Sequence, residues 1–126
     1  MQRLVAADGR ATLTLLAPNL QRLEWVARVS INPGDAQSVL AASRVLSKGE
    51  PYAILVIMTS IVDLPPDARA VFNAEPLVVA AALLGRGPMD EVLAAGACRA
   101  VHPTRFFLSE SSAREWLELS LAARSP

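Results

Sequence analysis

The sequence has very few of the side chains that most often perform catalysis or bind metals. Its 126 residues include one cysteine and one histidine. A lone Cys98 excludes an intramolecular disulfide and fits a reducing compartment. Cys98 and His102 lie four residues apart, but the further ligands that a zinc site needs are missing. The sequence has no Gly-x-Ser-x-Gly motif. His102 is expected at the end of a helix, where the helix dipole favours a cation. We therefore expect no catalytic residue, no metal and no cofactor, in a protein that is not an enzyme.

Long apolar runs and an excess of one charge are absent as well. The longest apolar run, Leu77–Leu84, is eight residues long, whereas about 20 are needed to span a bilayer. The first ten residues lack the apolar segment of a signal peptide. Twelve basic and twelve acidic residues are scattered along the chain, so no basic block favours nucleic acid or an anionic membrane. We expect a cytoplasmic protein with a single domain, residues 1–126.

Apolar side chains are what the chain has in excess. They make up 52% of the residues, and the mean hydropathy is +0.34. A domain of this size has a large surface for its volume and cannot easily bury so many apolar groups. We therefore expect a homo-oligomer, most simply a dimer, in which part of this surface is covered.

The first thirty residues have the pattern of three antiparallel strands. Two apolar segments, Leu4–Ala7 and Ala11–Leu16, flank Asp8-Gly9. That pair is favoured in two-residue hairpin turns, where both positions need positive φ. From Arg22 to Val29 apolar and polar residues alternate, which is typical of a strand with one covered face and one wet face. The alternation places Trp25 on the covered side.

After residue 30 the sequence predicts alternating helices and strands. The segment 32–35, Asn-Pro-Gly-Asp, is typical of a helix start, and Gly49 ends that helix. Ala53–Met58 and Leu77–Leu84 are apolar without alternation, as expected for strands buried on both faces. The remaining predicted elements are a helix from Pro65 to about Ala74, a helix from Gly87 to His102, a strand Arg105–Leu108 and a last helix capped by Ser109, with Ala113, Trp116, Leu117 and Leu121 facing inward.

This order of elements predicts an α/β fold. Strand–helix–strand connections generate parallel strands with helices covering the sheet. The N-terminal antiparallel meander makes the sheet mixed. We therefore expect one mixed β-sheet covered by about four helices.

Two segments, together with this order, resemble a known family. Ala53–Val62 is an apolar run that leads into a short loop, and Pro103–Ser109 leads into a helix with Trp116-Leu117. These segments resemble the central strand and the C-terminal part of the STAS domain, in a bacterial branch of that family. STAS is the SpoIIAA-like fold of anti-sigma-factor antagonists. The resemblance implies a STAS/SpoIIAA-like fold and a regulatory role through association with other proteins.

The serine that a partner kinase phosphorylates in STAS antagonists has no counterpart here. The matching segment, residues 64–68, has the sequence Leu-Pro-Pro-Asp-Ala, so the resemblance does not carry over phosphoregulation. Asp67 can in principle imitate a phosphorylated serine. An acidic residue in the first turn of a helix is, however, favoured by the helix dipole alone.

The resemblance places a partner surface over the loop and helix from Thr59 to Phe72. An alternative is a binder of a small apolar ligand or lipid, because related folds accommodate such ligands between sheet and helices. That alternative predicts an internal pocket of a few hundred cubic ångströms lined by leucine, valine and phenylalanine. The candidate partner residues are Thr59, Ser60, Asp63, Asp67, Arg69 and Phe72.

The loop Gly85-Arg86-Gly87 is a candidate anion site. It follows an apolar strand and precedes a helix, where free backbone N–H groups can meet an anion, and Arg86 supplies a cation. The loop lacks the glycine spacing and the Lys-Ser/Thr pair of nucleotide-binding loops. A tight strand-to-helix turn also favours two glycines, so both interpretations stay open.

Overall fold

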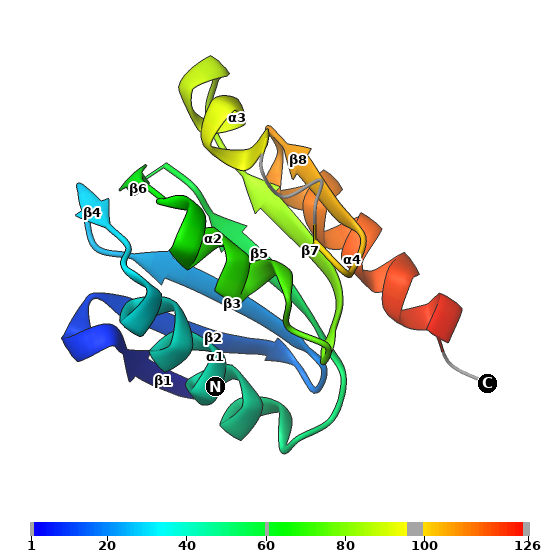
Figure 1. Ribbon diagram of the computed structural model, residues 1–126. Coiled ribbons are helices and arrows are strands. Elements are labelled where there is room, and N and C mark those ends of the chain that lie inside the picture. The colour runs from blue at the N-terminus through cyan, green and yellow to red at the C-terminus, as the bar shows by residue number, and fades with distance from the viewer. Residues whose placement is uncertain (1, 60, 96–99, 125–126) are drawn as a thin grey trace.

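A six-stranded mixed sheet organises the chain (Figure 1). The structure is a computed structural model that describes residues 2–59, 61–95 and 100–124. The first three strands in spatial order are antiparallel neighbours, and the next three run parallel to the third. In spatial order the strands are β1 (Arg3–Ala6), β2 (Ala11–Ala17), β3 (Leu20–Trp25), β5 (Tyr52–Ile57), β7 (Val78–Leu84) and β8 (Thr104–Phe107).

Helices cover both faces of this sheet. Helices α1 (Pro33–Ser47) and α2 (Pro66–Asn73) pack beside each other on one face, and α4 (Glu110–Arg124) packs on β5 and β7 on the other. The short helix α3 (Pro88–Ala94) follows the carboxyl end of β7. The predicted α/β class, the mixed sheet and the four helices are thus confirmed.

The central strands pack on both faces, as their unbroken apolar sequence predicts. Ala53 and Leu55 of β5 face α4, where they contact the buried Ala113 and Leu117. Tyr52 and Ile54 of the same strand belong to the core under α1 and α2. Because successive side chains of a strand point to opposite faces, a strand between two helical layers must be apolar at every position.

The β1–β2 hairpin forms, but its predicted two-residue turn is wrong. Ala6 pairs with Ala11, so four residues connect the strands. Ala7, Asp8 and Gly9 all have positive φ, at 54°, 55° and 87°. The Ala7 N–H donates to Ser38 Oγ of α1 at 2.9 Å. The turn is therefore wider than the Asp-Gly pair alone predicts, and it contacts a distant helix.

The third strand ends at Trp25, four residues before the predicted end at Val29. Arg28 has φ 60° and turns the chain away from the sheet. Val29 and Ser30 then form β4 (Val29–Ser30), which pairs in parallel with β6 (Ile61–Asp63). Alternation cannot reveal this two-stranded ribbon, because its strands are too short to show a period.

The α1 start is formed as predicted. Asn32 Oδ1 accepts the N–H of Asp35, and an Asp35 carboxylate oxygen accepts the N–H of Asn32, which completes a capping box. The carboxylate of Asp35 is buried and also pairs with Arg10 of the β1–β2 connection. The same acid therefore caps the helix and attaches the hairpin to it.

Helix α3 ends at Ala94, whereas the sequence predicts an end at His102. His102 lies in a bend before β8, where its ring is 3.1 Å from Thr104 Oγ1 and 3.4 Å from the Phe72 carbonyl oxygen. His102 therefore contacts the end of α2 and the start of β8. Cys98 lies outside the described residues.

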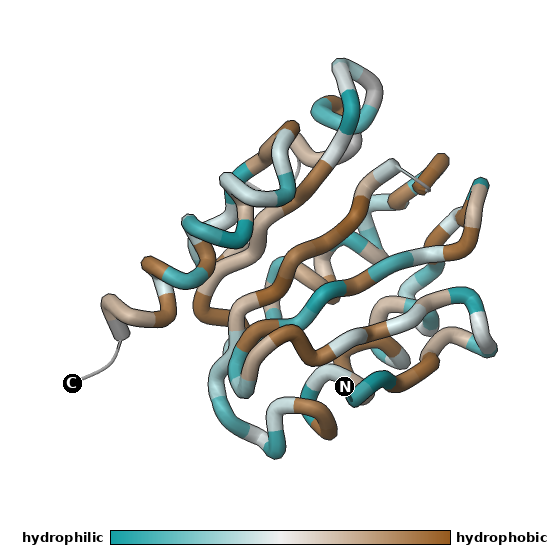
Figure 2. The backbone as a smooth tube through the Cα atoms, turned by 180° about the vertical axis from the view of Figure 1, so that it is seen from behind, coloured by the Kyte–Doolittle hydropathy of each residue, from teal (hydrophilic) through white to brown (hydrophobic). Residues whose placement is uncertain are grey.

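The second face of the sheet is only partly covered by helix (Figure 2). Helix α4 lies over β5 and β7, and the outer faces of β2 and β3 carry Thr12, Thr14, Arg22 and Glu24. Arg22 Nε donates to the carboxylate of Glu110 at the start of α4, over 3.1 Å. Polar side chains on this part of the sheet remove the need for a further helix.

Candidate functional site

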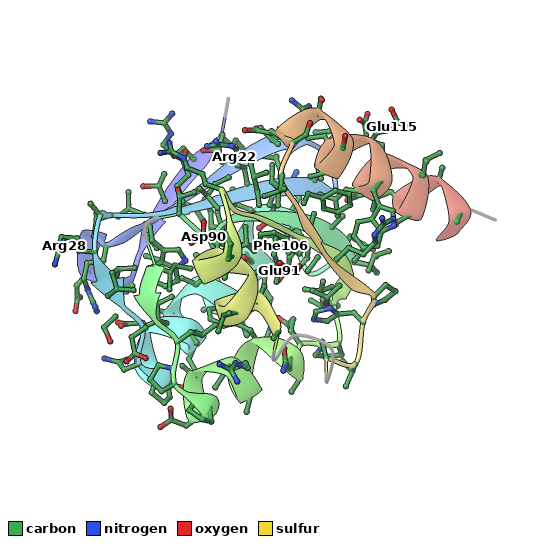
Figure 3. All side chains as sticks on the ribbon, turned by 90° about the horizontal axis from the view of Figure 1, so that it is seen from above. Arg22, Arg28, Asp90, Glu91, Phe106 and Glu115 are labelled. Atoms are coloured by element: carbon green, nitrogen blue, oxygen red, sulfur yellow. The ribbon has the colours of Figure 1, made fainter. Side chains whose placement is uncertain are left out.

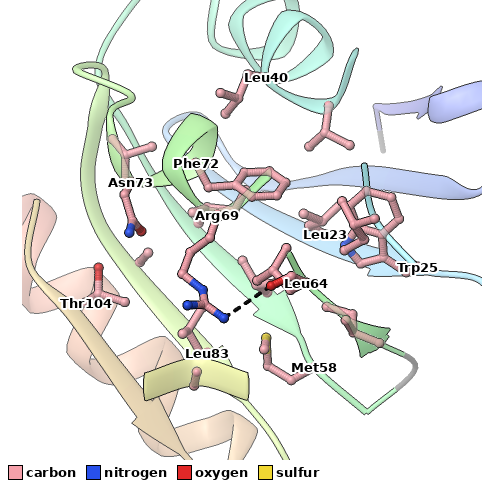
Figure 4. Close-up of a pocket in the computed structure, with 18 of the residues that line it drawn as sticks. Leu23, Trp25, Leu40, Met58, Leu64, Arg69, Phe72, Asn73, Leu83 and Thr104 are labelled. Carbon is pink, nitrogen blue, oxygen red and sulfur yellow. Dashed lines mark hydrogen bonds between the residues drawn. The ribbon is translucent and has the colours of Figure 1, made fainter. Parts of the chain in front are cut away.

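A cavity of about 80 Å³ lies between the sheet and helix α2 (Figure 4). Its walls come from β3, β5 and β7, from α1 and α2, and from the end of α3. Of the twenty described residues that line it, sixteen have apolar or aromatic side chains. Leucine, isoleucine and valine dominate, with Trp25, Met58 and Phe72 among the larger groups. A pocket of the predicted lining is therefore present between sheet and helices, but at about 80 Å³ it is smaller than the predicted few hundred cubic ångströms.

Small side chains leave this space open. Ala81 of β7 and Ala94 of α3 line the cavity where larger residues would fill it. Helix α2 has a single fully buried residue, Ala68. Its larger inward residue Phe72 is only half-buried and reaches over the cavity (Figure 4). The cavity is thus covered by a short helix that packs on the sheet with small side chains.

Helix α2 is tied to α1 by an ion pair. Arg44 of α1 donates from Nε and Nη2 to both carboxylate oxygens of Glu75, at 3.0 and 2.9 Å. The Glu75 side chain is fully buried just after α2, whereas that of Arg44 is 52% exposed. Hydrogen bonding to Glu75 and its negative charge raise the pKa of Arg44. The two hydrogen bonds between the guanidinium and the carboxylate give this contact a fixed geometry.

Among the described lining residues four are polar: Arg69, Asn73, His102 and Thr104. Arg69 and Asn73 are one turn apart on α2 and share a face of the helix. His102 bridges the end of α2 and the start of β8 through its contacts with Phe72 O and Thr104 Oγ1. Thr104 Oγ1 in turn donates to the carbonyl oxygen of His102. The polar residues therefore gather where α2 meets β8.

Arg69 carries a positive charge into the apolar space. Its Nη2 donates to the carbonyl oxygen of Leu64 at 3.2 Å (Figure 4). Its Nε is buried and has no hydrogen-bond partner among the described residues. The ion pairs of the described residues involve Arg10, Arg22 and Arg44, and none includes Arg69.

Tyr52 forms part of the cavity wall and is fully buried. Burial raises the pKa of the Tyr52 hydroxyl to about 12, because the charged phenolate loses its hydration. The nearby Ser43 hydroxyl opposes this shift. Neither hydroxyl oxygen, however, has a partner at hydrogen-bonding geometry among the described residues. The Tyr52 ring is thus part of the apolar cavity wall, and its hydroxyl group has no hydrogen-bond partner among the described residues.

The structure divides the predicted partner residues into two groups. Thr59, Asp63 and Asp67 are exposed, and Asp67 Oδ1 accepts the N–H of Ala68 within the first turn of α2. Arg69 and Phe72 instead line the cavity. The sixth candidate, Ser60, lies outside the described residues.

The candidate anion loop is occupied by a side chain of its own helix. Asp90 Oδ2 of α3 accepts the N–H of Arg86 at 2.8 Å. A Cβ on Gly85 would lie 2.5 Å from Asp90 Cβ and 2.7 Å from the Phe106 ring, and these two residues flank the loop (Figure 3). Nothing lies within 4 Å of a Cβ built on Gly87. Close packing explains Gly85, and the Asp90 carboxylate takes the place that an anion would need.

Asn73, His102 and Thr104 line the cavity but are not predicted from the sequence as site residues. The four-residue spacing of Arg69 and Asn73 on one helix face was a usable signal for the first. His102 and Thr104 reach the cavity only because β8 lies next to β7 in the sheet. Among the described residues, no group of three histidine, cysteine, aspartate or glutamate side chains could hold a metal ion. No described helix is long and apolar enough to cross a membrane.

Comparison with known proteins identifies the fold. No family model and no curated protein matches the sequence. In three dimensions, the mixed sheet with its antiparallel N-terminal strands and four helices is the SpoIIAA-like α/β fold. The chain is similar to an uncharacterized protein of the DUF3478 family with a SpoIIAA-like fold, from Shewanella loihica PV-4. The TM-score is 0.64, with 15% identity over 93% of this chain and 98% of that one. The predicted SpoIIAA-like resemblance is confirmed at the level of the fold.

Proposed function

We propose that this chain is a binding module, rather than an enzyme, that holds a small apolar ligand between its sheet and helix α2. The cavity of about 80 Å³ carries the proposal, because its wall is almost entirely apolar. Ligand sites in proteins are mostly apolar hollows with a few placed polar groups, and Arg69 and its polar neighbours supply these groups here.

The size of the cavity limits the ligand. About 10–15 Å³ of such volume accommodates one water-sized sphere. A cavity of 80 Å³ therefore holds on the order of five to eight non-hydrogen atoms. Apolar cavities of this kind bind small hydrocarbons instead of filling with water. A short alkyl chain or a single ring fits this limit, whereas a whole lipid does not.

The test uses 1-hexanol as a neutral probe and compares two alanine-to-leucine variants. Ala81→Leu adds a larger side chain inside the cavity, whereas Ala122→Leu makes the same change on the exposed surface of α4. We expect saturable NMR shifts of cavity-lining residues, including the Trp25 indole, in the wild type and in Ala122→Leu. Ala81→Leu should lose them. A wild type without saturable shifts, or an Ala81→Leu variant that binds equally well, would contradict the proposal.

A second proposal is association of two copies of the chain through the segment Thr59–Asp67. It is supported by Val62 of β6, which is 57% exposed beside the exposed Thr59 and Asp63, and by the high mean hydropathy. Light scattering should give a dimer for the wild type and a monomer for Val62→Glu. Leu119→Glu, at a 63% exposed position of α4, serves as the matched control and should stay dimeric. A monomeric wild type contradicts this second proposal and leaves the first untouched.

A further inference from the structure

Arg69 places an unbalanced charge at the cavity. The described residues that line the cavity include no aspartate or glutamate. The guanidinium has five N–H donors, and its one hydrogen bond within the described residues runs to a neutral carbonyl oxygen, that of Leu64. The Arg69 side chain is partly buried and its Nε is fully buried, so the lack of a counter-ion is unfavourable. An anionic group next to Arg69 would remove that penalty and satisfy the buried Nε.

The position of Arg69 suits a ligand with a polar head and an apolar body. Arg69 and Asn73 line the inner cavity and also a surface hollow of about 290 Å³ that is bordered by Pro66, Ala70, Ala74 and Val101. The two residues therefore lie between the apolar interior and the solvent. A ligand whose charged end reaches Arg69 can leave that end hydrated while its apolar part lies under α2.

On these grounds, and resting on the proposed function, we propose that the ligand is a small monocarboxylate whose carboxylate pairs with Arg69. The planar guanidinium matches a carboxylate with two parallel hydrogen bonds. The described lining residues include one arginine and no lysine. One permanent cation balances the single charge of a carboxylate better than the charge of about −2 on a phosphate monoester.

The experiment compares hexanoate with 1-hexanol at neutral pH, where hexanoate is ionised. The two probes share the alkyl chain and differ in the charged head. In the wild type we expect hexanoate to bind about tenfold more tightly than 1-hexanol, as expected for one charge-assisted contact at a partly buried site. In Arg69→Gln the ratio of the two dissociation constants should fall to about one, because only hexanoate loses a charge-assisted contact. Arg86→Gln, in the Gly85–Gly87 loop, is the matched control and should keep the wild-type ratio.

The outcomes separate this inference from the proposed function. Binding of 1-hexanol with no preference for hexanoate in the wild type overturns the carboxylate assignment but preserves the apolar site. Loss of the preference in Arg86→Gln, rather than in Arg69→Gln, overturns it in favour of the loop. Failure of both probes to bind the wild type refutes the apolar site itself.

A conservative variant covers the case in which Arg69→Gln does not fold. Arg69→Lys keeps the positive charge and removes the planar fork. We expect it to lower the preference for hexanoate over 1-hexanol several-fold. An undiminished preference in Arg69→Lys, together with unchanged NMR shifts at residues 69–73 on addition of hexanoate, would overturn the pairing.

Discussion

At the scale of single residues, Tyr52 shows how burial changes an ionisable group. Its hydroxyl is buried without a hydrogen-bond partner among the described residues, and its pKa is raised to about 12. The folded protein therefore holds the hydroxyl proton of Tyr52 more tightly than the unfolded chain does. Below the ordinary value of 10.0 both states are protonated, and the full stability is present. As the pH rises further, the unfolded state loses its proton first.

The expected consequence is a loss of stability between about pH 10 and pH 12. The free energy of unfolding should fall by about 1.4 kcal/mol per pH unit across this window, roughly 2–3 kcal/mol in total. Denaturant unfolding of the wild type and of Tyr52→Phe at several pH values measures the difference, because the phenylalanine variant lacks this contribution. The chain contains one tyrosine, so phenolate absorbance reports its pKa directly. A titration midpoint near 10 in the folded protein would refute the burial argument.

Tyr52→Phe should also be well tolerated at neutral pH. Replacement removes a polar atom that has no partner among the described residues and keeps the ring that packs in the core. We expect the free energy of unfolding to stay the same or to rise by up to about 1 kcal/mol. A decrease of more than about 1 kcal/mol would mean that the hydroxyl makes a bond in solution.

The two glycines that flank Arg86 give a second test at this scale. Gly85→Ala places a methyl group against Asp90 and Phe106, and we expect it to destabilise the protein by about 1–3 kcal/mol. Gly87→Ala meets nothing within 4 Å and should change the free energy of unfolding by less than about 1 kcal/mol, since the restriction of the unfolded chain by alanine offsets its weaker N-cap of α3. Thermal unfolding of both variants measures the contrast. Equal effects would show that close packing is not the reason for Gly85.

At the scale of elements, the Arg44–Glu75 pair holds α2 beside α1. The position of α2 matters because this helix forms the roof of the cavity and carries Arg69. The helix itself buries one residue completely, Ala68. The ion pair at its end therefore supplies a larger part of its attachment than a surface pair would.

We expect Arg44→Ala to destabilise the protein by about 2–3 kcal/mol, because it leaves the buried carboxylate of Glu75 unpaired. The value is below that of a fully buried pair, since Arg44 is half exposed and water can partly replace it. Arg22→Ala is the matched control. Its partners Glu24 and Glu110 are 52% and 41% exposed, and the change should be below about 1 kcal/mol. Denaturant unfolding compares them, and similar losses would contradict the tie between α1 and α2.

At the scale of the whole molecule, the two layers beside the sheet are packed differently. The layer under α4 is filled by Ala80, Ala82, Ala113 and Leu117, all fully buried. The layer under α2 contains the cavity. Adjacent residues of β7 face these two layers, Ala81 on the side of the cavity and Ala82 on the side of α4.

The same alanine-to-leucine change should therefore affect the stability of the protein differently at these two neighbouring positions. Ala82→Leu overpacks a filled layer and should destabilise the protein by about 1–3 kcal/mol. Ala81→Leu enters free space and should change the free energy of unfolding by less than about 1 kcal/mol, with stabilisation favoured. Calorimetry of the two variants decides the point. An Ala81→Leu variant as unstable as Ala82→Leu would mean that the cavity is closed in solution.

The sequence by itself determined the class of the fold and most of its elements. Local rules suffice there, because a capping box, a proline in the first turn or an unbroken apolar strand acts within a few residues. The start of α1, the buried strands β5 and β7, and the Ser109 cap of α4 followed from such patterns. The short β4–β6 ribbon and the wide β1–β2 turn did not, since both depend on contacts between distant segments.

Only the tertiary structure decided the candidate site. The sequence suggested a pocket between sheet and helices but could not place it. It grouped Arg69 and Phe72 with surface residues, although both line the cavity. Ala81, His102 and Thr104 come together with them through the parallel order of β7 and β8 and the position of α2. A cavity is a volume that side-chain packing leaves empty. Its position depends on how the helices pack on the sheet, and no local sequence pattern determines that packing.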